Sequence, residues 1–324
     1  MSTFTSLAQA HRAAYATHGF AKALNLRGAP FDGSFSSQMA EEVNELIDRE
    51  QIELVLPGCP KSARSFCGIQ PMLKAKAFPG PTLEMFDLLN NKYEFAKICR
   101  YLEIPHPETL VVASKEELLN GGCLDRIGTP VMCKPLSAAG QEGVVKVRRD
   151  HLDTDLRKVD YAPILVQKYV EGEEIGTGVY CRNGEIVMFI AHRFAKGTYK
   201  TFEAPEIRAS IQKLALMFHL NGVYNFDLIV DKNGQAQFLE CNPRFYFKML
   251  LSHVAGLNFA APGIVSDTDS LPQTIGYTST RLPRAWPRML MTPWTITRTD
   301  LAMARTLLSD PVKSLREIVR LDWV

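Results

Sequence analysis

The chain has 324 residues, of which 46% are hydrophobic and 22% are charged, and its formal net charge is +2. These values are typical of a globular protein and exclude a disordered chain, a fibrous repeat and a protein that binds nucleic acid through a strongly basic surface. The seven cysteines form no Cys-x-x-Cys or Cys/His cluster, which argues against structural zinc and a disulfide framework. We therefore expect a protein of a reducing, cytoplasmic compartment.

The first part of the chain predicts an α/β layer. Residues 36–50 have the apolar spacing of a helix and lead into a short apolar strand at 52–56, which stops at Pro57-Gly58. A helix followed by a strand favours a lobe with a parallel sheet. The GxGxxG turn that usually opens a dinucleotide-binding lobe is absent, so this lobe either lacks its first βα unit or does not bind nucleotide.

A well-signalled helix follows Asn91. Asn91 is a good N-cap, Glu94 stands where it could complete a capping box, and Pro105 ends the apolar stripe. Lys92 lies in the first turn of this helix, where the helix dipole disfavours a cation. Its position indicates either a bound anion or an ordinary surface lysine.

The next segments predict a small antiparallel sheet with a loop suited to phosphate. A strand at 109–113 and a helix near 115–119 precede two strands, 130–134 and 143–147, which should pair across a loop of small residues. Lys134 ends the first of this pair. Loop amides beside a lysine can bind phosphates, although a lysine at a strand end can simply reach solvent. We expect loop 137–143 to close over bound phosphates.

The middle of the chain continues with an apolar strand at 164–167, a strand around 177–181 and a helix at 208–221 that Gly222 should cap. His192 and Arg193 follow an apolar strand, where they either line a substrate site or have a structural role. The tail from residue 266 is rich in Pro, Thr and Arg. We expect Trp286 and Trp294 to pack against the rest of the protein, with contact to a membrane surface as the alternative.

Residues 225–244 carry the strongest chemical signal. Two apolar runs flank Asn233-Gly234, which is the typical sequence of a two-residue hairpin turn. Such a turn would place Lys232 opposite Gln235 and so determine the register. That register places two pairs of polar residues opposite each other: Asp227 with Glu240, and Asn225 with Asn242.

Opposed carboxylates at this hairpin predict a metal site. Asp227 and Glu240 would repel each other unless a cation lay between them. Oxygens of Asp, Glu and Asn suit a hard ion such as Mg²⁺, so we expect Asp227, Glu240 and Asn242 to be metal ligands. A solvated polar face is the alternative, but it does not explain why Arg244 follows the acids directly after Pro243.

Taken in chain order, these pieces resemble the ATP-grasp superfamily, including the ATP-grasp domains of carbamoyl-phosphate synthetases. The resemblance covers roughly residues 50–260 and rests on four segments: 91–92, 130–135, 165–174 and 240–244. It implies an α/β and α+β fold in which two α+β lobes grip ATP, preceded by a reduced Rossmann-like lobe. The implied segments are an N-terminal lobe at 1–108, a small ATP-grasp lobe at 109–175, a large lobe with the metal site at 176–265, and a tail at 266–324.

The resemblance also implies a role for individual residues in binding ATP. Lys92 and Lys134 match the lysines that contact phosphates. Gln167 matches the position that accepts a hydrogen bond from the adenine amino group, a task that an amide oxygen can perform. Tyr169 would offer its backbone to the adenine edge, and Glu174 matches the acid that binds the ribose.

The same resemblance assigns the chemistry at the end of the hairpin. Asp227, Glu240 and Asn242 match the Mg²⁺ ligands, with Mn²⁺ as a possible substitute. Arg244 matches the arginine that steadies the transferred phosphoryl group, so Arg244 and Lys134 are the expected catalytic residues. Phe245-Tyr246-Phe247 departs from the family pattern of small residues and predicts an aromatic acceptor pocket.

The activity implied by the resemblance is ligation that depends on ATP and Mg²⁺. A small-molecule carboxylate would become an acyl phosphate and join an amine or thiol, with release of ADP and phosphate; no nucleic acid takes part. Two alternatives stay open. One is a non-catalytic ATP-binding or scaffold protein, and the other is a carboxylase-type enzyme that uses bicarbonate.

Overall fold

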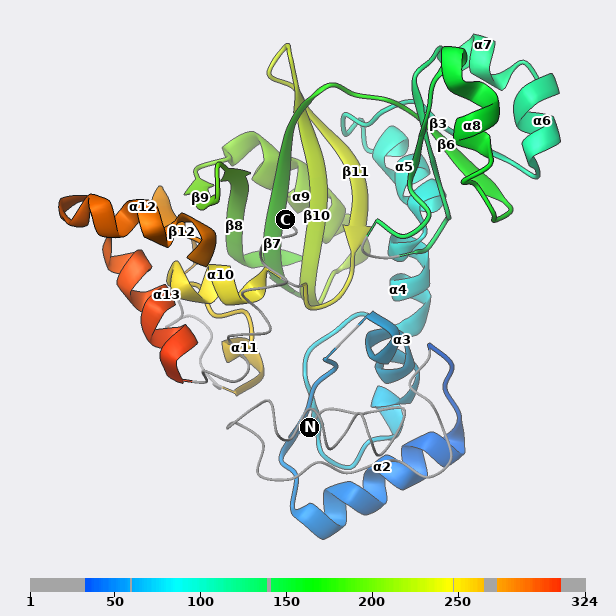
Figure 1. Cartoon of the computed structure of the whole chain (residues 1–324). Helices are drawn as coiled ribbons and strands as arrows, with labels where there is room; N and C mark the ends of the chain where they lie inside the picture. Colours follow the sequence, from blue (N-terminus) through cyan, green and yellow to red (C-terminus); the bar gives the residue numbers. More distant parts are fainter. Residues whose placement is uncertain (1–32, 59, 139–140, 247, 265–272, 310–324) are drawn as a thin grey trace. The chain divides into compact units, whose positions relative to one another are not determined.

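The computed structural model describes residues 33–58, 60–138, 141–246, 248–264 and 273–309 (Figure 1). The chain divides into two compact units, which we describe separately. Unit 1 comprises Met1–Phe86, Thr177–Asn225 and Pro243–Val324, and unit 2 comprises Asp87–Gly176 and Phe226–Asn242. The four segments predicted from the sequence stay a prediction.

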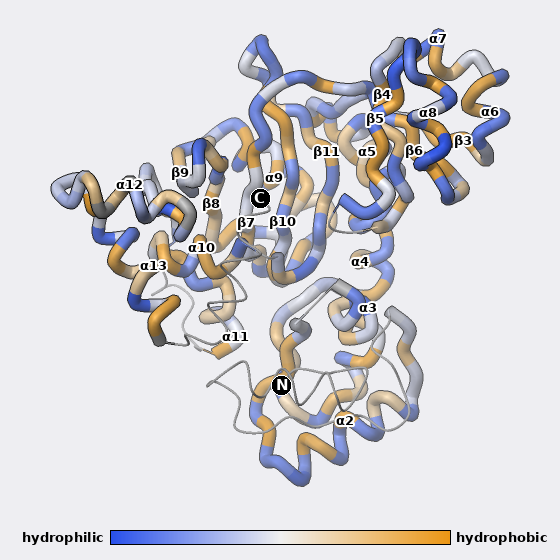
Figure 2. Tube along the Cα trace, in the orientation of Figure 1, coloured by the Kyte–Doolittle hydropathy of each residue, from blue (hydrophilic) through white to orange (hydrophobic). Residues whose placement is uncertain are grey.

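The N-terminal part of unit 1 is a small α/β layer. Helix α2 (Ser37–Glu50) confirms the predicted helix, and it begins at Ser36, whose hydroxyl accepts from the Met39 N–H. Hydrophobic and hydrophilic residues alternate along α2 (Figure 2), as expected for a helix that buries one face. The remaining elements of this layer are β1 (Leu54–Val55), α3 (Pro60–Ile69), η1 (Gln70–Met72) and β2 (Lys76–Ala77).

Strands β1 and β2 pair in parallel, as predicted for this lobe, although β1 is shorter than the expected strand. The predicted absence of an opening βα unit concerns residues 1–32, which lie outside the described residues.

The larger sheet contains six strands in the order β11-β10-β7-β8-β9-β12. These strands are β7 (Gly172–Arg182), β8 (Glu185–Ala195), β9 (Thr198–Phe202), β10 (Gly222–Asp231), β11 (Ala236–Asn242) and β12 (Thr278–Arg281). Tight turns with positive φ join β7 to β8 at Asn183-Gly184 and β8 to β9 at Lys196-Gly197. Such two-residue turns match the right-handed twist of the strands they connect.

Helix α9 (Pro205–Phe218) differs from its prediction at both ends. It begins at a proline, which fits the first helical position because the N–H it lacks would be unpaired there. It ends at His219, which adopts the left-handed conformation with φ 47°. Gly222 is therefore not the helix cap. Its φ of +105° opens β10, where a Cβ atom would lie 2.7 Å from the Pro79 carbonyl oxygen.

Unit 2 contains an antiparallel sheet of four strands in the order β3-β6-β4-β5. Its elements are α5 (Lys92–Tyr101), β3 (Thr109–Val112), α6 (Lys115–Asn120), α7 (Cys123–Ile127), β4 (Val131–Lys134), β5 (Val145–Val147), η2 (Arg149–His151), α8 (Leu152–Leu156) and β6 (Ile164–Lys168). The predicted antiparallel pair is confirmed, with Val131 opposite Val147. Helices α6, α7 and α8 pack on this sheet through a core that includes Leu118, Leu124 and Leu156.

Helix α5 confirms the predicted N-cap but not the capping box. Helix α4 (Leu83–Asn90) ends directly before Asn91, whose side-chain oxygen accepts from the N–H groups of Tyr93 and Glu94. The Asn91 N–H, which the box would give to Glu94, donates instead to the Asp87 carbonyl. The Glu94 carboxylate pairs with Lys97 at 2.6 Å.

The C-terminal elements pack on the rest of unit 1 through β12, which pairs with β9, and through one apolar cluster. The elements are α10 (Met249–Val254), α11 (Ala261–Ile264), η3 (Pro283–Ala285), α12 (Trp286–Met291), η4 (Pro293–Thr295) and α13 (Arg298–Ser309). Trp286 packs on this cluster as predicted. The same prediction is wrong for Trp294, whose exposed fraction is 80%.

Two further observations concern membrane-spanning helices and the cysteines. None of the described helices is long and apolar enough to cross a membrane. Among the described cysteines, all are free thiols and all are buried.

Candidate functional site

The hairpin that carries the acidic residues has a different turn from the predicted one. The Asp231 N–H donates to the Gln235 carbonyl, and the Gly234 N–H donates to the Asp231 carbonyl. Asp231 therefore faces Gln235, and three residues form the loop instead of two. Gly234 has φ +81°, which allows this longer turn. The predicted pairing of Lys232 with Gln235 is wrong.

The acidic residues nevertheless meet at the end of this hairpin. The side-chain nitrogen of Asn242 lies 3.2 Å from Asp227 Oδ2 and 3.3 Å from Glu240 Oε1. Both carboxylates thus converge on one polar atom within unit 2. Asn225 is not part of this cluster, because its amide donates to the Thr177 carbonyl at 2.8 Å.

Lys92 joins this cluster from the first turn of α5. Its side chain is 7% exposed, and its ammonium group lies 3.1 Å from Glu240 Oε2. It also donates to the Ala138 carbonyl at 2.7 Å. The anion that its unfavourable position in the helix dipole indicated is therefore, in this structure, the carboxylate of Glu240.

Lys134 is held at the end of β4 by a chain of side-chain hydrogen bonds. Its ammonium group donates to Gln167 Oε1 at 2.8 Å, and Gln167 Nε2 donates to the Thr109 hydroxyl at 3.1 Å. All three residues are buried. No local sequence signal indicates Thr109, because its place opposite Gln167 depends on the pairing of β3 with β6.

The charges of this cluster act on one another strongly. Burial lowers the pKa of Lys134, and the nearby charge of Lys92 lowers it further, while Glu240 opposes the shift. Burial alone would raise the pKa of Glu240, but the charges of Lys92 and Lys134 outweigh it and keep that pKa below its usual value. The site therefore holds two cations and two carboxylates at close range, a balance that bound phosphates and a metal ion would change.

The remaining residues predicted to contact the nucleotide belong to unit 2. The Tyr169 N–H donates to the Pro130 carbonyl, and Lys146 lies 3.5 Å from the centroid of its ring. Glu174 is exposed at the start of β7, and its charge acts on Lys134. In this structure the Gln167 oxygen accepts from Lys134, so its contact with adenine stays a prediction.

The predicted phosphate loop includes residues 139–140, which lie outside the described residues. On one side of them, Lys92 binds the Ala138 carbonyl, as above. On the other side, the Tyr161 hydroxyl donates to the Gly143 carbonyl at 2.6 Å. Closure of the loop over phosphates stays a prediction.

Arg244 lies in unit 1, two residues after Asn242 along the chain. It borders an apolar hollow whose walls include Phe66, Phe78 and Phe245. Phe78 and Phe245 meet edge to face at 4.7 Å. The predicted aromatic surroundings after Arg244 thus include Phe245, while Phe247 lies outside the described residues.

His192 has a structural place in the core of unit 1. Its ring is fully buried and lies 4.9 Å from the ring of Tyr199 and 6.4 Å from that of Tyr246. Tyr246 is buried as well, and its hydroxyl lies 2.9 Å from the Ser252 hydroxyl. Of the two roles considered for His192, the structural one agrees with this burial.

The donor set at the hairpin fits a hard metal ion. Two carboxylate oxygens already converge on the positive end of the Asn242 amide, where a cation would find both within reach. Rotation of that amide would present its oxygen as a third ligand. Among the described residues, no three Asp, Glu, His or Cys side chains form a metal cluster. The two carboxylates and the Asn242 amide suit Mg²⁺, which binds one or two carboxylates and completes its shell with phosphates and water.

Comparison with known proteins identifies the fold. A family model described as "ATP-grasp in the biosynthetic pathway with Ter operon" matches residues 160–282. The structure resembles N5-carboxyaminoimidazole synthetase from Staphylococcus aureus with a TM-score of 0.60, at 15% identity over 84% of this chain and 71% of that one. The chain has an ATP-grasp fold.

A second ATP-grasp structure is similar to a comparable degree. The biotin carboxylase domain of 2-oxoglutarate carboxylase from Hydrogenobacter thermophilus, solved with MgADP and bicarbonate, gives a TM-score of 0.59 at 18% identity. The match covers 74% of this chain and 58% of that one. The predicted fold class is confirmed, while the Rossmann-like character of the first lobe stays a prediction.

Curated relatives of the ATP-grasp chain include large chains of carbamoyl phosphate synthase. That of Thermomicrobium roseum is 26% identical over 185 residues, which are 51% of this chain and 17% of the relative. That of Clostridium perfringens (strain 13) is 25% identical over 233 residues, which are 65% of this chain and 21% of the relative. The chain thus spans only a small part of these relatives, and the predicted resemblance to the superfamily is confirmed.

Proposed function

We propose that this ATP-grasp chain is a ligase that depends on ATP and Mg²⁺. It activates a small carboxylate as an acyl phosphate, joins it to an amine and releases ADP and phosphate. The observation that carries the proposal is the convergence, within unit 2, of Lys92 with Asp227, Glu240 and Asn242. A scaffold protein would have no need to bury Lys92 against Glu240, beside Asp227 and Asn242, whose side chains can bind a metal ion.

The lysines would neutralise the phosphates. Lys134 and Lys92 present ammonium groups from β4 and α5. Hydrogen bonds to Gln167 and to the Ala138 carbonyl already fix the positions of these two side chains. Gln167 would position Lys134 through their hydrogen bond, beside its predicted contact with adenine. In phosphoryl transfer most of the catalysis comes from such positioning and charge neutralisation.

The other assigned residues complete the proposal. Asp227, Glu240 and Asn242 would hold Mg²⁺, which when bound neutralises charge on the transferred phosphoryl group. Glu174 is free to reach a ribose because it is exposed. Arg244 would steady the acyl phosphate.

A carboxylase-type reaction is the second candidate. The similar biotin carboxylase domain was solved with bicarbonate, and the curated relatives are carbamoyl phosphate synthases. In that reaction bicarbonate would take the place of the organic carboxylate. The ATP-binding residues would keep the same roles, so the two candidates differ in the acid that accepts the phosphoryl group.

Nucleotide turnover tests the proposal directly. The protein is mixed with ATP, Mg²⁺ and panels of carboxylates and amines, with and without bicarbonate, and the nucleotides are separated by chromatography. We expect ADP release that depends on one acid and one amine. ADP release that needs bicarbonate alone would favour the carboxylase reaction, and AMP with pyrophosphate would contradict both mechanisms.

A matched pair of lysine variants on α5 tests the assigned site. Lys92→Met removes the buried ammonium group beside Glu240, and we expect turnover to fall by roughly 10²–10³-fold, as for loss of other groups that stabilise transition-state charge. Lys97→Met changes an exposed lysine on the same helix that pairs only with Glu94 among the described ion pairs. It should retain full turnover. Equal activity of both variants would refute the role of Lys92.

A further inference from the structure

The C-terminal elements of unit 1 expose large apolar side chains, among them Trp294, which was expected to be buried. The exposed fraction is 78% for Met291, 80% for Trp294 and 75% for Leu308. They belong to α12, η4 and α13, which follow one another along the chain (Figure 1). Large apolar side chains exposed on consecutive elements are typical of a surface that contacts another molecule.

Helix α13 shows that this exposure follows a pattern. Its inner face buries Asp300, Met303 and Leu307, which are spaced three and four residues apart. Its outer face has the same spacing and carries four exposed residues: Arg298, Leu301, Arg305 and Leu308. Arginine and leucine therefore alternate along the outer face of a helix whose inner face is already packed.

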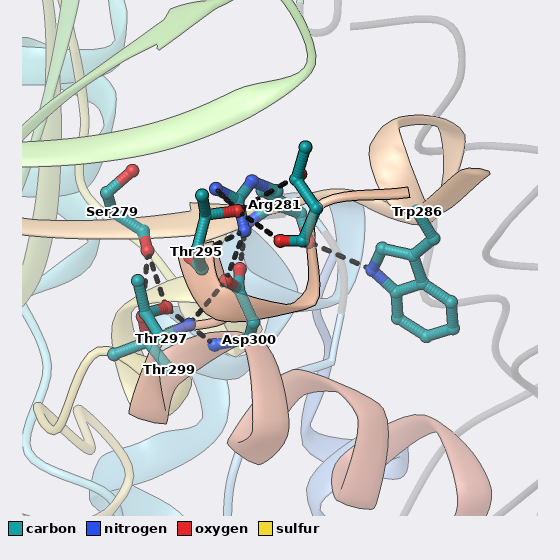
Figure 3. A network of polar contacts seen from close by, with 8 residues as sticks. Ser279, Arg281, Trp286, Thr295, Thr297, Thr299 and Asp300 are labelled. Atoms are coloured by element: carbon teal, nitrogen blue, oxygen red, sulfur yellow. Dashed lines mark hydrogen bonds and ion pairs between the residues drawn. The ribbon is translucent and has the colours of Figure 1, made fainter. Parts of the chain in front are cut away.

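Hydrogen bonds to β12 anchor the turn that follows the exposed Trp294. The Arg281 guanidinium donates to the Thr295 carbonyl at 3.0 Å and pairs with Asp300 at 3.0 Å. The hydroxyls of Thr297 and Thr299 donate to the Ser279 carbonyl. Figure 3 shows how this network ties the turn after Trp294 and the first turn of α13 to β12. The exposed tryptophan thus belongs to an anchored turn.

Residues 277–308 carry a net positive charge. Between Tyr277 and Leu308 the sequence contains five arginines, no lysine, no glutamate and a single acid, Asp300. Asp300 is buried and paired with Arg281, so it does not balance the exposed arginines. The outer face of α13 is therefore cationic as well as apolar.

We propose that the surface formed by Met291, Trp294 and the outer face of α13 binds an anionic phospholipid membrane. Arginines attract the headgroups, while tryptophan and leucine side chains enter the boundary between headgroups and acyl chains. A second copy of this chain fits less well, because a symmetric contact would bring arginine against arginine. The proposal is independent of the ligase activity and agrees with binding to the surface of a bilayer without crossing it.

Vesicle sedimentation of the full chain tests the proposal. The probes are vesicles of phosphatidylcholine and vesicles of phosphatidylcholine with phosphatidylglycerol, at low and high salt. We expect binding to the anionic vesicles alone, and weaker binding at high salt because salt screens the attraction. Absence of binding to anionic vesicles, or equal binding to both kinds, would overturn the proposal.

Two double variants separate the charged and the apolar contributions. Arg298→Gln with Arg305→Gln should weaken binding about 30-fold, since each basic residue near an anionic membrane contributes about 1 kcal/mol. Trp294→Ser with Leu308→Ser should weaken it on the order of a hundredfold, because it removes two side chains that would be buried in the membrane. All four residues are exposed, so thermal unfolding should show folded variants.

The matched control places the same kinds of change elsewhere. Arg100→Gln with Tyr101→Ser alters an exposed arginine and a tyrosine that is 75% exposed at the end of α5. It should bind vesicles like the unaltered chain, and equal loss in the control would overturn the proposal. Binding to polyglutamate with no binding to vesicles would instead indicate an acidic protein partner. A dimer that Trp294→Ser with Leu308→Ser dissociates, again without vesicle binding, would indicate self-association.

Discussion

The ion pair between Lys92 and Glu240 changes the expected behaviour of the predicted metal site. From the sequence, two opposed carboxylates should repel each other in the absence of a cation, so loss of one should cost no stability. In the structure Lys92 compensates the charge of Glu240 at 3.1 Å. Removal of either partner would leave the other as a buried charge with less compensation.

The variant Glu240→Gln should therefore lower the free energy of unfolding without nucleotide, by roughly 1–3 kcal/mol, because Lys92 loses its carboxylate partner. Urea denaturation measures the change. The double variant Lys92→Met with Glu240→Gln should recover part of the loss, because Lys92 is then no longer a buried charge without its carboxylate partner. A double variant whose loss equals the sum of the single losses would contradict the coupling of the two residues.

His192 predicts a dependence of stability on pH. Both ring nitrogens lack a hydrogen-bond partner among the described residues, and burial, with the charge of Lys248, holds the pKa of the ring well below its usual value. Below about pH 6.5 the unfolded chain therefore binds a proton that the folded chain does not. The folded state loses stability as the pH falls, by up to about 1.4 kcal/mol per pH unit.

The variant His192→Phe should remove this part of the pH dependence. It should also match or exceed the unaltered protein in stability at neutral pH, because no buried nitrogen is left without a partner. Denaturant unfolding between neutral pH and about pH 5 measures both effects, and the same replacement at the exposed His253 is the control. An unchanged slope in His192→Phe would show that another group causes the dependence.

At the scale of elements, turn residues determine much of the larger sheet. Asn183-Gly184 has the sequence and the positive φ angles of a two-residue hairpin turn, although the prediction of such a turn was made only for Asn233-Gly234. The latter forms a three-residue loop, because the hydrogen bonds join Asp231 to Gln235. The dipeptide thus marks a hairpin reliably, while the loop length depends on how the two strands pair.

Close approach of strands β7 and β10 leads to a prediction at Gly172. A Cβ atom there would lie 2.1 Å from the Val230 carbonyl oxygen and 2.6 Å from a methyl carbon of Ile229. Gly172→Ala should therefore lower the free energy of unfolding by roughly 1–3 kcal/mol, since the strand backbone must shift. Gly58→Ala is the control, because nothing lies within 4 Å of its added carbon. Thermal unfolding should show a loss of stability in the first variant only.

At the scale of the whole molecule, the proposed function predicts stabilisation by nucleotide. A ligand present at a hundred times its Kd stabilises the folded state by about 2.7 kcal/mol. ATP with Mg²⁺ should therefore raise the unfolding temperature, and removal of Mg²⁺ by a chelator should reduce the effect. Lys134→Met should reduce it as well, because the ammonium group would contact the phosphates. An equal rise with AMP would contradict binding through the phosphates.

The sequence by itself determined the local elements and the chemical character of the site. The apolar spacing of residues 36–50 predicted helix α2. Asn91 predicted the start of α5, because a cap satisfies N–H groups within a few residues of itself. The ordered motifs predicted the ATP-grasp fold, and Asp227, Glu240 and Asn242 were predicted to meet. All of these signals depend on residues close in sequence or on a motif order that the chain carries in full.

Only the tertiary structure decided which charges compensate one another. Lys92 and Glu240 are far apart in sequence, and no spacing rule pairs them. The hold of Gln167 on Lys134 likewise requires β6 to lie beside β4. The anchoring of the turn that follows Trp294 also depends on distant segments, because Arg281 of β12 donates to Thr295 and pairs with Asp300. Strand pairing and core packing determine the contacts between distant segments, and composition and local sequence pattern do not predict them.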